Sequence, residues 1–181
     1  MNKHGASNQS NHNNFMFNYR MFSERHIGRS LQNTNFVYAL NPKSPHKEDR
    51  MTGKELINLA IEAQKNAYAP YSKFHVGAAL LASDGEVFTG ANVENASFGL
   101  TNCAERSALF SAVSHGKRHF EAIAIVGGKE SEITDFCPPC GACRQALAEF
   151  SGDGRLRVIL FNGKEEKELT LASLLPESFN L

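Results

Sequence analysis

The spacing of hydrophobic residues divides the chain into two parts. Residues 1–50 are rich in Asn, Ser and His, as in "HGASNQSNHNN", and show no sustained helical or strand period. Such a composition is typical of segments that cannot bury enough apolar surface to fold. We therefore expect residues 1–50 to be a disordered or weakly ordered N-terminal extension. Residues 51–181 carry regular hydrophobic patterns and are expected to form one domain.

The patterned part opens with a predicted helix and a predicted hairpin. Thr52 and Glu55 have the spacing of a capping box, which satisfies free N–H groups at a helix start. Apolar residues then recur at helical intervals, namely Leu56, Leu59, Ala60, Ala63 and Ala67. Farther along, "HVGAALLAS" and "VFTGANV" flank Asp84-Gly85, a dipeptide typical of the tight turn between two antiparallel strands.

The remaining patterns alternate helices with strands. "AERSALFSAVSHG" predicts a helix that stops at Gly116, and "GACRQALAEFS" predicts a second helix. "EAIAIVGG" is a continuous apolar run, typical of a strand buried on both faces. "RLRVILFN" is another strand, with one more short strand expected near "KEL". This order predicts an α/β fold, a three-layer α-β-α sandwich around a mixed central sheet of about five strands.

Composition and charge argue against several classes of protein. The chain is 41% hydrophobic and 21% charged, which is ordinary for a globular domain. No apolar run approaches the roughly 18 residues that span a bilayer, and the start of the chain lacks the apolar core of a secretion signal. Residues 1–46 carry five basic residues against one acidic residue, so the remainder of this neutral chain is acidic. An acidic body disfavours nucleic acid as a partner.

Cysteine usage points to a reducing compartment. Three of the four cysteines are bunched together, which suits metal ligands or thiol chemistry better than a disulfide framework. We expect a cytoplasmic protein, with residues 1–50 as an untargeted tail or as sequence upstream of a start at Met51. The scattered Arg and Ser of that segment also leave an organelle transit peptide open.

The cysteines lie where helices are predicted to begin. In "CPPCGACRQ", Cys140 starts a helical pattern and Cys143 follows one turn later. Cys103 precedes the other predicted helix, with Asn102 as the expected cap. The aligned peptide dipoles at a helix N-terminus lower thiol pKa values, so thiolates are available to bind a metal.

Glu105 and Arg106 complete this pattern. A Cys-x-Glu followed by Pro-Cys-x-x-Cys is the arrangement of zinc-dependent deaminases, in which the Glu acts without binding the metal. Three protein ligands leave the fourth zinc position for water, whose pKa the metal lowers towards about 7. Glu105 can then shuttle protons. Arg106 is expected to return positive charge to the sulfur ligands.

Several motifs in the right order resemble one family. "YAPYSKFHVGAALLASDG", "GANVENASFGLTNCAERSAL", "PCGACRQ" and "LLPESF" are similar to the small homotetrameric cytidine deaminases, over nearly all of residues 51–181. The resemblance implies one zinc ion per chain, with Cys103, Cys140 and Cys143 as ligands and Glu105 as general acid and base. It also implies deamination of cytidine and 2′-deoxycytidine in a homotetramer whose sites are shared between subunits.

The same resemblance implies substrate contacts. Asn92 and Glu94 lie two apart at a strand end, so their side chains are expected on one face, where they can hold ribose hydroxyls. Phe74 would form a wall of the base pocket, and Ala104 would also contact substrate. Phe179 would reach the site of a neighbouring subunit and stack on the pyrimidine.

Three positions depart from the family pattern. Phe98 stands where the family commonly has Tyr, so a hydroxyl contact is missing there. Pro138 replaces a common Ser or Thr, although its carbonyl can still accept a hydrogen bond from the leaving amine. Cys137 has no family role and is expected to be a small, partly buried thiol. Three histidines are expected to be structural, namely His75, His115 and His119.

Two other classes account for some of these residues. A thiol oxidoreductase would use the pair Cys137 and Cys140 at a helix start, but thioredoxin-like folds carry that pair early, and Cys103 and Cys143 would have no role. A closed structural zinc module would use all four cysteines and leave Glu105 idle.

Related deaminases differ in substrate. Enzymes acting on deoxycytidylate, guanine or tRNA adenosine typically have His as the first ligand. A blasticidin-type enzyme shares the "CAE" start, but "NVEN" together with "LLPESF" is not expected there. We therefore expect a small nucleoside as the substrate and neither a nucleic acid nor a membrane as a partner.

Overall fold

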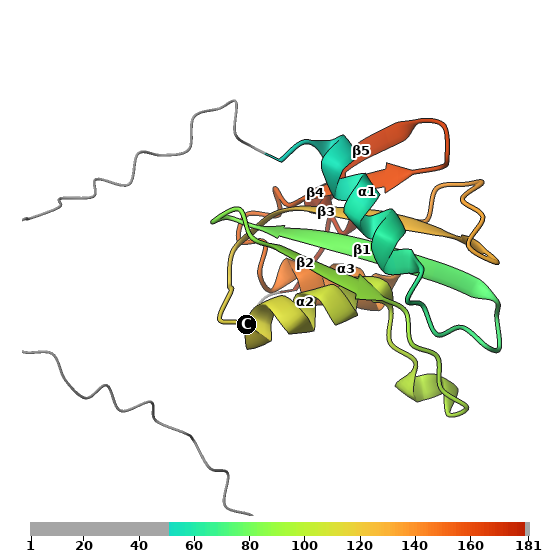
Figure 1. The fold of residues 1–181 in the computed structure, drawn as a ribbon. Helices are drawn as coiled ribbons and strands as arrows, with labels where there is room; N and C mark the ends of the chain where they lie inside the picture. Colours follow the sequence, from blue (N-terminus) through green and yellow to red (C-terminus); the bar gives the residue numbers. More distant parts are fainter. Residues whose placement is uncertain (1–50, 180–181) are drawn as a thin grey trace, which may run out of the picture. The chain divides into compact units, whose positions relative to one another are not determined.

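The computed structural model describes residues 51–179, and the expected extension over residues 1–50 lies outside them. The elements are α1 (Gly53–Gln64), β1 (Phe74–Ala82), β2 (Val87–Ala91), the 3₁₀ helix η1 (Phe98–Leu100), α2 (Ala104–Ser114), β3 (Phe120–Lys129), α3 (Gly141–Ala148), β4 (Arg157–Phe161), β5 (Glu166–Thr170) and α4 (Leu171–Leu174) (Figure 1). This order confirms the predicted one and adds the short elements η1 and α4.

A five-stranded sheet forms the middle layer, with the strand order β2-β1-β3-β4-β5. Strand β3 runs parallel to β4, whereas the other neighbouring pairs are antiparallel. Helix α1 covers one face of this mixed sheet, and α2 and α3 cover the other (Figure 1). The predicted three-layer α-β-α sandwich is confirmed.

The central strand β3 explains the continuous apolar run. Its alternate residues face opposite layers, with Ile123 and Ile125 in the core below α2 and α3 and Ala124 in the core below α1. Small residues on the α1 side allow a close approach of helix to sheet. At Gly77 of β1, a Cβ atom would come within 2.0 Å of the carbonyl oxygen of Ala60 in α1.

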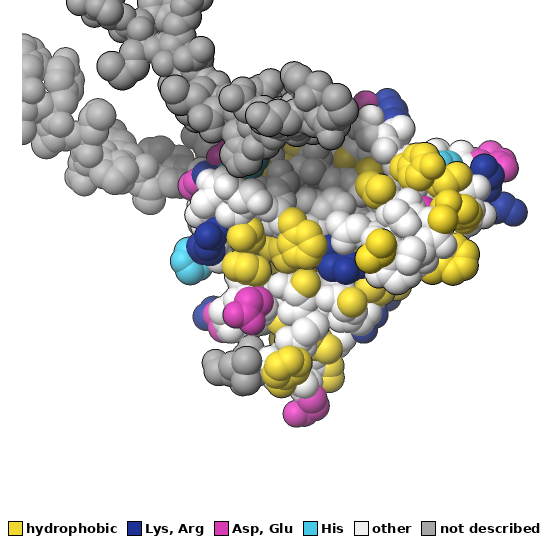
Figure 2. Space-filling view, turned by 90° about the horizontal axis from the view of Figure 1, so that it is seen from below, with side chains coloured by type: hydrophobic (Ala, Val, Ile, Leu, Met, Phe, Trp, Pro, Cys, Tyr) yellow, Lys and Arg dark blue, Asp and Glu magenta, His cyan; other side chains and the backbone are white. Residues whose placement is uncertain are grey.

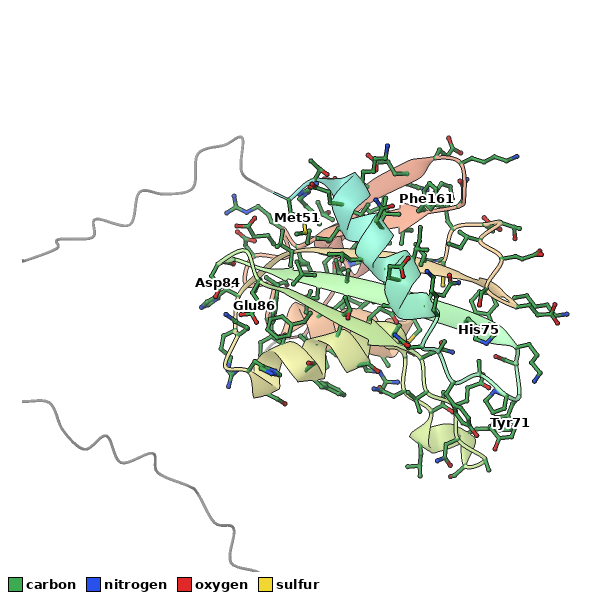
Figure 3. All side chains as sticks on the ribbon, in the orientation of Figure 1. Met51, Tyr71, His75, Asp84, Glu86 and Phe161 are labelled. Carbon is green, nitrogen blue, oxygen red and sulfur yellow. The ribbon has the colours of Figure 1, made fainter. Side chains whose placement is uncertain are left out.

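Local signals set the boundaries of the elements. Thr52 and Glu55 form the predicted capping box of α1. Gly85 adopts a φ of 93° in the β1–β2 turn, a left-handed conformation that glycine tolerates. Figure 3 shows Asp84 and Glu86 of this turn at the opposite end of the sheet from Tyr71. Within residues 51–179, no helix combines the length and hydrophobicity that a bilayer crossing requires.

Candidate active site

Three thiols from two separate segments meet at one point. The Sγ atoms of Cys103 and Cys140 are 3.9 Å apart, those of Cys140 and Cys143 are 3.5 Å apart, and all three lie within 4.8 Å of one another. Three sulfurs at about 2.3 Å from a tetrahedral zinc ion are separated by about 3.8 Å. The spacing therefore fits zinc. Cys137 is not part of this group among the residues that the structure describes.

Two helix starts position the thiols. Cys103 is the N-cap residue of α2, Cys140 is the N-cap residue of α3, and Cys143 lies in the first turn of α3. The prediction that Asn102 caps α2 is wrong, because the extended residue that precedes the helix is Cys103, with φ −78° and ψ 155°. Asn102 instead donates from Nδ2 to the Ser107 hydroxyl at 3.1 Å.

The surroundings of the thiols favour a thiolate. A hydrogen bond from Cys143, followed by the proximity of Arg106, holds the pKa of Cys103 well below its ordinary value. The pKa of Cys143 is raised, because its thiol supplies the proton of that hydrogen bond. Arg106 Nη2 lies 3.7 Å from Cys103 Sγ and donates to the Thr101 carbonyl oxygen at 3.3 Å. Arg106 therefore brings positive charge next to a sulfur ligand, as expected from the sequence.

Glu105 is a buried carboxyl group next to this cluster. It is the second residue of α2 and only 4% exposed. Burial raises the pKa of Glu105, and the negative charge of Cys103 raises it further. A carboxyl group with a raised pKa can both accept and donate a proton near neutral pH, which is what a general acid and base must do.

Asn92 and Glu94 both face the segment at residues 71–76. Asn92 Oδ1 accepts from the Val76 backbone N–H at 2.8 Å, and its Nδ2 donates to the Phe74 carbonyl oxygen at 2.9 Å. Glu94 Oε2 accepts from the backbone N–H groups of Tyr71 at 2.9 Å and Ser72 at 3.2 Å. Hydrogen bonds from these two residues lower the pKa of Glu94, so its side chain is a carboxylate.

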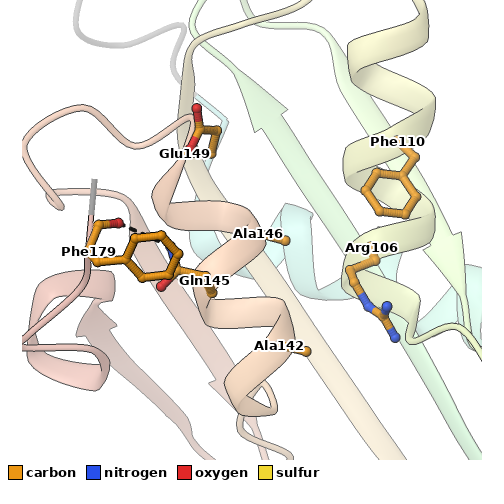
Figure 4. A pocket seen from close by; sticks show the side chains of 7 residues that line it. All are labelled: Arg106, Phe110, Ala142, Gln145, Ala146, Glu149 and Phe179. Carbon is orange, nitrogen blue, oxygen red and sulfur yellow. Dashed lines mark hydrogen bonds between the residues drawn. The ribbon is translucent and has the colours of Figure 1, made fainter. Parts of the chain in front are cut away.

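The other predicted substrate contacts are more widely spread. Phe74 is partly exposed at the start of β1, whereas Ala104 is fully buried as the first residue of α2. Phe179 is 65% exposed. Figure 4 shows it beside α3, where Gln145 donates to its carbonyl oxygen at 3.3 Å. It lines a pocket of about 580 Å³ that also contains Arg106.

Sequence reasoning missed the segment that holds Glu94 and Phe74 in place. Tyr71 and Ser72 are more than 20 residues from Glu94, and no local pattern indicates that their N–H groups bind its carboxylate. One signal was available, since the Ser72 hydroxyl accepts from the Phe74 N–H at 3.0 Å in a serine turn. Lys73, between them, has a left-handed φ of 59°.

This fold and this group of side chains define a zinc-dependent deaminase. Residues 51–159 match the family model described as the cytidine and deoxycytidylate deaminase zinc-binding region. The chain belongs to this family of deaminases.

Individual relatives agree with the family model. The chain is 51% identical over 130 residues to a cytidine deaminase of Halalkalibacterium halodurans, covering 71% of this chain and 95% of the relative. The crystal structure of cytidine deaminase from Burkholderia pseudomallei superposes with a TM-score of 0.65 at 51% identity, over 71% of this chain and all of that one. A cytidine deaminase structure from Mycobacterium tuberculosis gives a TM-score of 0.62 at 40% identity, over 72% and 99% of the two chains.

Proposed function

We propose that this chain deaminates cytidine and 2′-deoxycytidine hydrolytically to uridine and 2′-deoxyuridine, with release of ammonia, as a step of pyrimidine salvage. The observation that carries the proposal is the buried Glu105 carboxyl beside three thiols with the spacing of zinc ligands. Cys103, Cys140 and Cys143 would hold one zinc ion per chain. When bound, zinc with three protein ligands keeps one position for water and makes that water more acidic.

Glu105 moves the protons in the proposed reaction. It accepts a proton from the water that attacks C4 of the base, and delivers it to ring N3. It then takes the proton of the new hydroxyl group on C4 and passes it to the amine. The C4–N bond breaks, a carbonyl group forms at C4, and the amine leaves as ammonia. Its burial supports this role, because burial raises the pKa of the carboxyl group and so makes it a better proton acceptor than an exposed carboxylate. Arg106 balances the charge of the thiolates through its contact with Cys103.

Asn92, Glu94 and Phe74 hold the nucleoside in this proposal. The Asn92 amide uses one hydrogen and one lone pair on the backbone of β1, so a second hydrogen is free for a sugar hydroxyl. Glu94 uses Oε2 on the loop before β1, which leaves Oε1 as an acceptor. Phe74 offers a partly exposed ring as a wall for the base. Ala104 would contact the substrate through its backbone, since its side chain lies in the core.

We further propose a cytoplasmic homotetramer whose sites are shared between subunits. Several large apolar side chains are exposed in the described residues, including Tyr71, Phe98, Leu100, Phe110 and Phe179. Figure 2 shows hydrophobic side chains gathered in groups on the face that carries α2. Exposed apolar side chains that gather into patches mark interaction surfaces. Phe179 would stack on the base bound by a neighbouring subunit. The proposed location in the cytoplasm is supported by the cysteine ligands, which must stay unoxidised and therefore favour a reducing compartment.

Parallel assays of related substrates test the proposal. Purified, zinc-loaded protein is incubated with cytidine, 2′-deoxycytidine, cytidylate and blasticidin S, and ammonia release is followed together with the product spectrum. We expect turnover of the two nucleosides, and little or none of the nucleotide and the antibiotic. Preferential turnover of cytidylate or blasticidin S would reject the proposed substrate class while leaving the deaminase chemistry intact.

A further inference from the structure

Cys137 lies on the same side of the sheet as the proposed active site. It belongs to the segment between β3 and α3, is partly buried, and packs against the core below α2 and α3. It lies against Gly127 of β3. A Cβ atom added to Gly127 would be 2.7 Å from Cys137 Sγ and 3.1 Å from Phe74 Cε1. The thiol and the edge of the Phe74 ring therefore converge on the space that this glycine leaves open.

The Cys137 thiol also lies close enough to two residues of the proposed active site to be influenced by their charges. Burial raises the pKa of Cys137 to about 11, and the nearby negative charges of Glu105 and Cys103 add to this effect. Cys137 is therefore a neutral thiol at physiological pH, and it does not belong to the ligand group formed by the other three cysteines among the described residues. Its side chain thus approaches Gly127 beside the proposed wall of the base pocket, within reach of the charge of the proposed proton shuttle.

We propose that Cys137, seated over Gly127, forms with Phe74 the wall that limits the room around the reacting end of the pyrimidine. Its volume then sets how large a substituent the enzyme accepts beside C4, on ring carbon C5 or on the amine. The inference rests on the proposed function, because it assigns Cys137 a place in the same pocket. A glycine at position 127 is part of this design, since any larger residue would displace the thiol or the Phe74 ring.

Substrates of graded size test this role. The ratio of kcat/KM for 5-bromocytidine to kcat/KM for cytidine is measured in the wild type and in three variants. Cys137→Ala should raise the ratio by about tenfold, because one heavy atom in an apolar pocket changes discrimination by that order. Cys137→Leu should lower it. Cys137→Ser keeps the number of side-chain heavy atoms but replaces sulfur by the smaller oxygen, so its ratio should lie between those of the wild type and Cys137→Ala.

A purely structural role would lower stability without changing the ratio, so the ratio separates the two explanations. Equal ratios in the wild type, Cys137→Ala and Cys137→Leu would overturn the inference, as would a change in Cys137→Ser as large as that in Cys137→Ala. The double variant Gly127→Ala/Cys137→Ala should be more active on cytidine than Gly127→Ala alone, because the close approach of the methyl group introduced at position 127 to Cys137 Sγ is removed. A double variant that is no more active than Gly127→Ala would also count against the inference. A wild type inactive on cytidine would overturn the proposed function itself, whereas an active enzyme with unchanged ratios would overturn this inference alone.

Discussion

The sulfur atoms of Cys103 and Cys140 lie 3.9 Å apart although the two residues are 37 positions apart in the sequence. Each is the N-cap residue of a helix, so the starts of α2 and α3 meet at this point. Because the two helices cover the same face of one sheet, their packing alone brings the thiols together. The site is therefore built by the fold, and its ligands come from elements that are otherwise separate.

Removal of one thiol should weaken metal binding strongly. Cys143→Ala should weaken zinc binding by more than about 100-fold, because loss of a ligand costs more than loss of a supporting group. Zinc per chain is measured by elemental analysis after dialysis. Cys137→Ala is the control and should keep one zinc ion per chain. Full zinc occupancy in Cys143→Ala, or loss of zinc in Cys137→Ala, would show that a different set of sulfurs binds the metal.

Much of the fold was predictable because its signals are local. The capping box at Thr52 and the turn at Asp84-Gly85 each lie within four residues, and both formed as expected. The cap of α2 was mispredicted because Asn102 has the usual capping chemistry, whereas the backbone places the extended residue at Cys103.

The thiol cluster was predictable because its spacing pattern is specific. The contacts around it were not. Glu94 binds backbone N–H groups that lie more than 20 residues earlier, and Cys137 and the Phe74 ring approach the same glycine, Gly127. Such contacts depend on how strands and loops pack, and a single sequence carries no pattern for them.

Glu94 should matter more for binding than for chemistry. Glu94→Ala removes the proposed sugar acceptor and frees the N–H groups of Tyr71 and Ser72. We expect KM for cytidine to rise about tenfold or more, as for the loss of a hydrogen bond to a charged group, with a smaller change in kcat. Steady-state kinetics measure both. Glu94→Gln keeps an acceptor oxygen, so its KM should lie between those of the wild type and Glu94→Ala. An unchanged KM in Glu94→Ala would show that Glu94 does not bind the substrate.

Phe179 should act across a subunit boundary. Phe179→Ala should raise KM for cytidine, because the proposed stacking contact is worth about 1 kcal/mol or more. Chains of Phe179→Ala are then mixed and reassembled with chains of Glu105→Gln, which keep Phe179 but lack the proposed proton shuttle. The mixed tetramers should show a lower KM for cytidine than Phe179→Ala alone. Each active site belongs to a Phe179→Ala chain, which keeps Glu105, and can receive the phenylalanine of a neighbouring Glu105→Gln chain. Absence of any such gain, or an active monomer in light scattering, would contradict a shared site.

The β1–β2 turn should make stability depend on pH. Lys117 hydrogen-bonds to Asp84 and forms an ion pair with Glu86 at 2.6 Å. The hydrogen bond from Lys117 lowers the pKa of Asp84. A group whose folded pKa is lowered stabilises the protein above its unfolded pKa of about 3.9, and this contribution is lost as the pH falls through the folded value.

Asp84→Asn tests this dependence, since Asn keeps the side-chain oxygen that accepts from the Glu86 N–H at 3.3 Å. Urea unfolding at neutral pH should show the variant to be less stable than the wild type, and the difference should be smaller at about pH 3. The turn lies at the opposite end of the sheet from Tyr71 (Figure 3), so kcat should not change. A stability difference that is the same at both pH values would rule out the ion pair as its cause.

The most direct test compares uridine formation from cytidine by the wild type and by Glu105→Gln, both loaded with zinc. The substitution removes the proton shuttle but no metal ligand, so the variant should fold and keep one zinc ion per chain. Its kcat should fall by about 1,000-fold or more, the scale of a lost general acid and base. A variant that carries zinc and forms uridine at the wild-type rate would contradict the account.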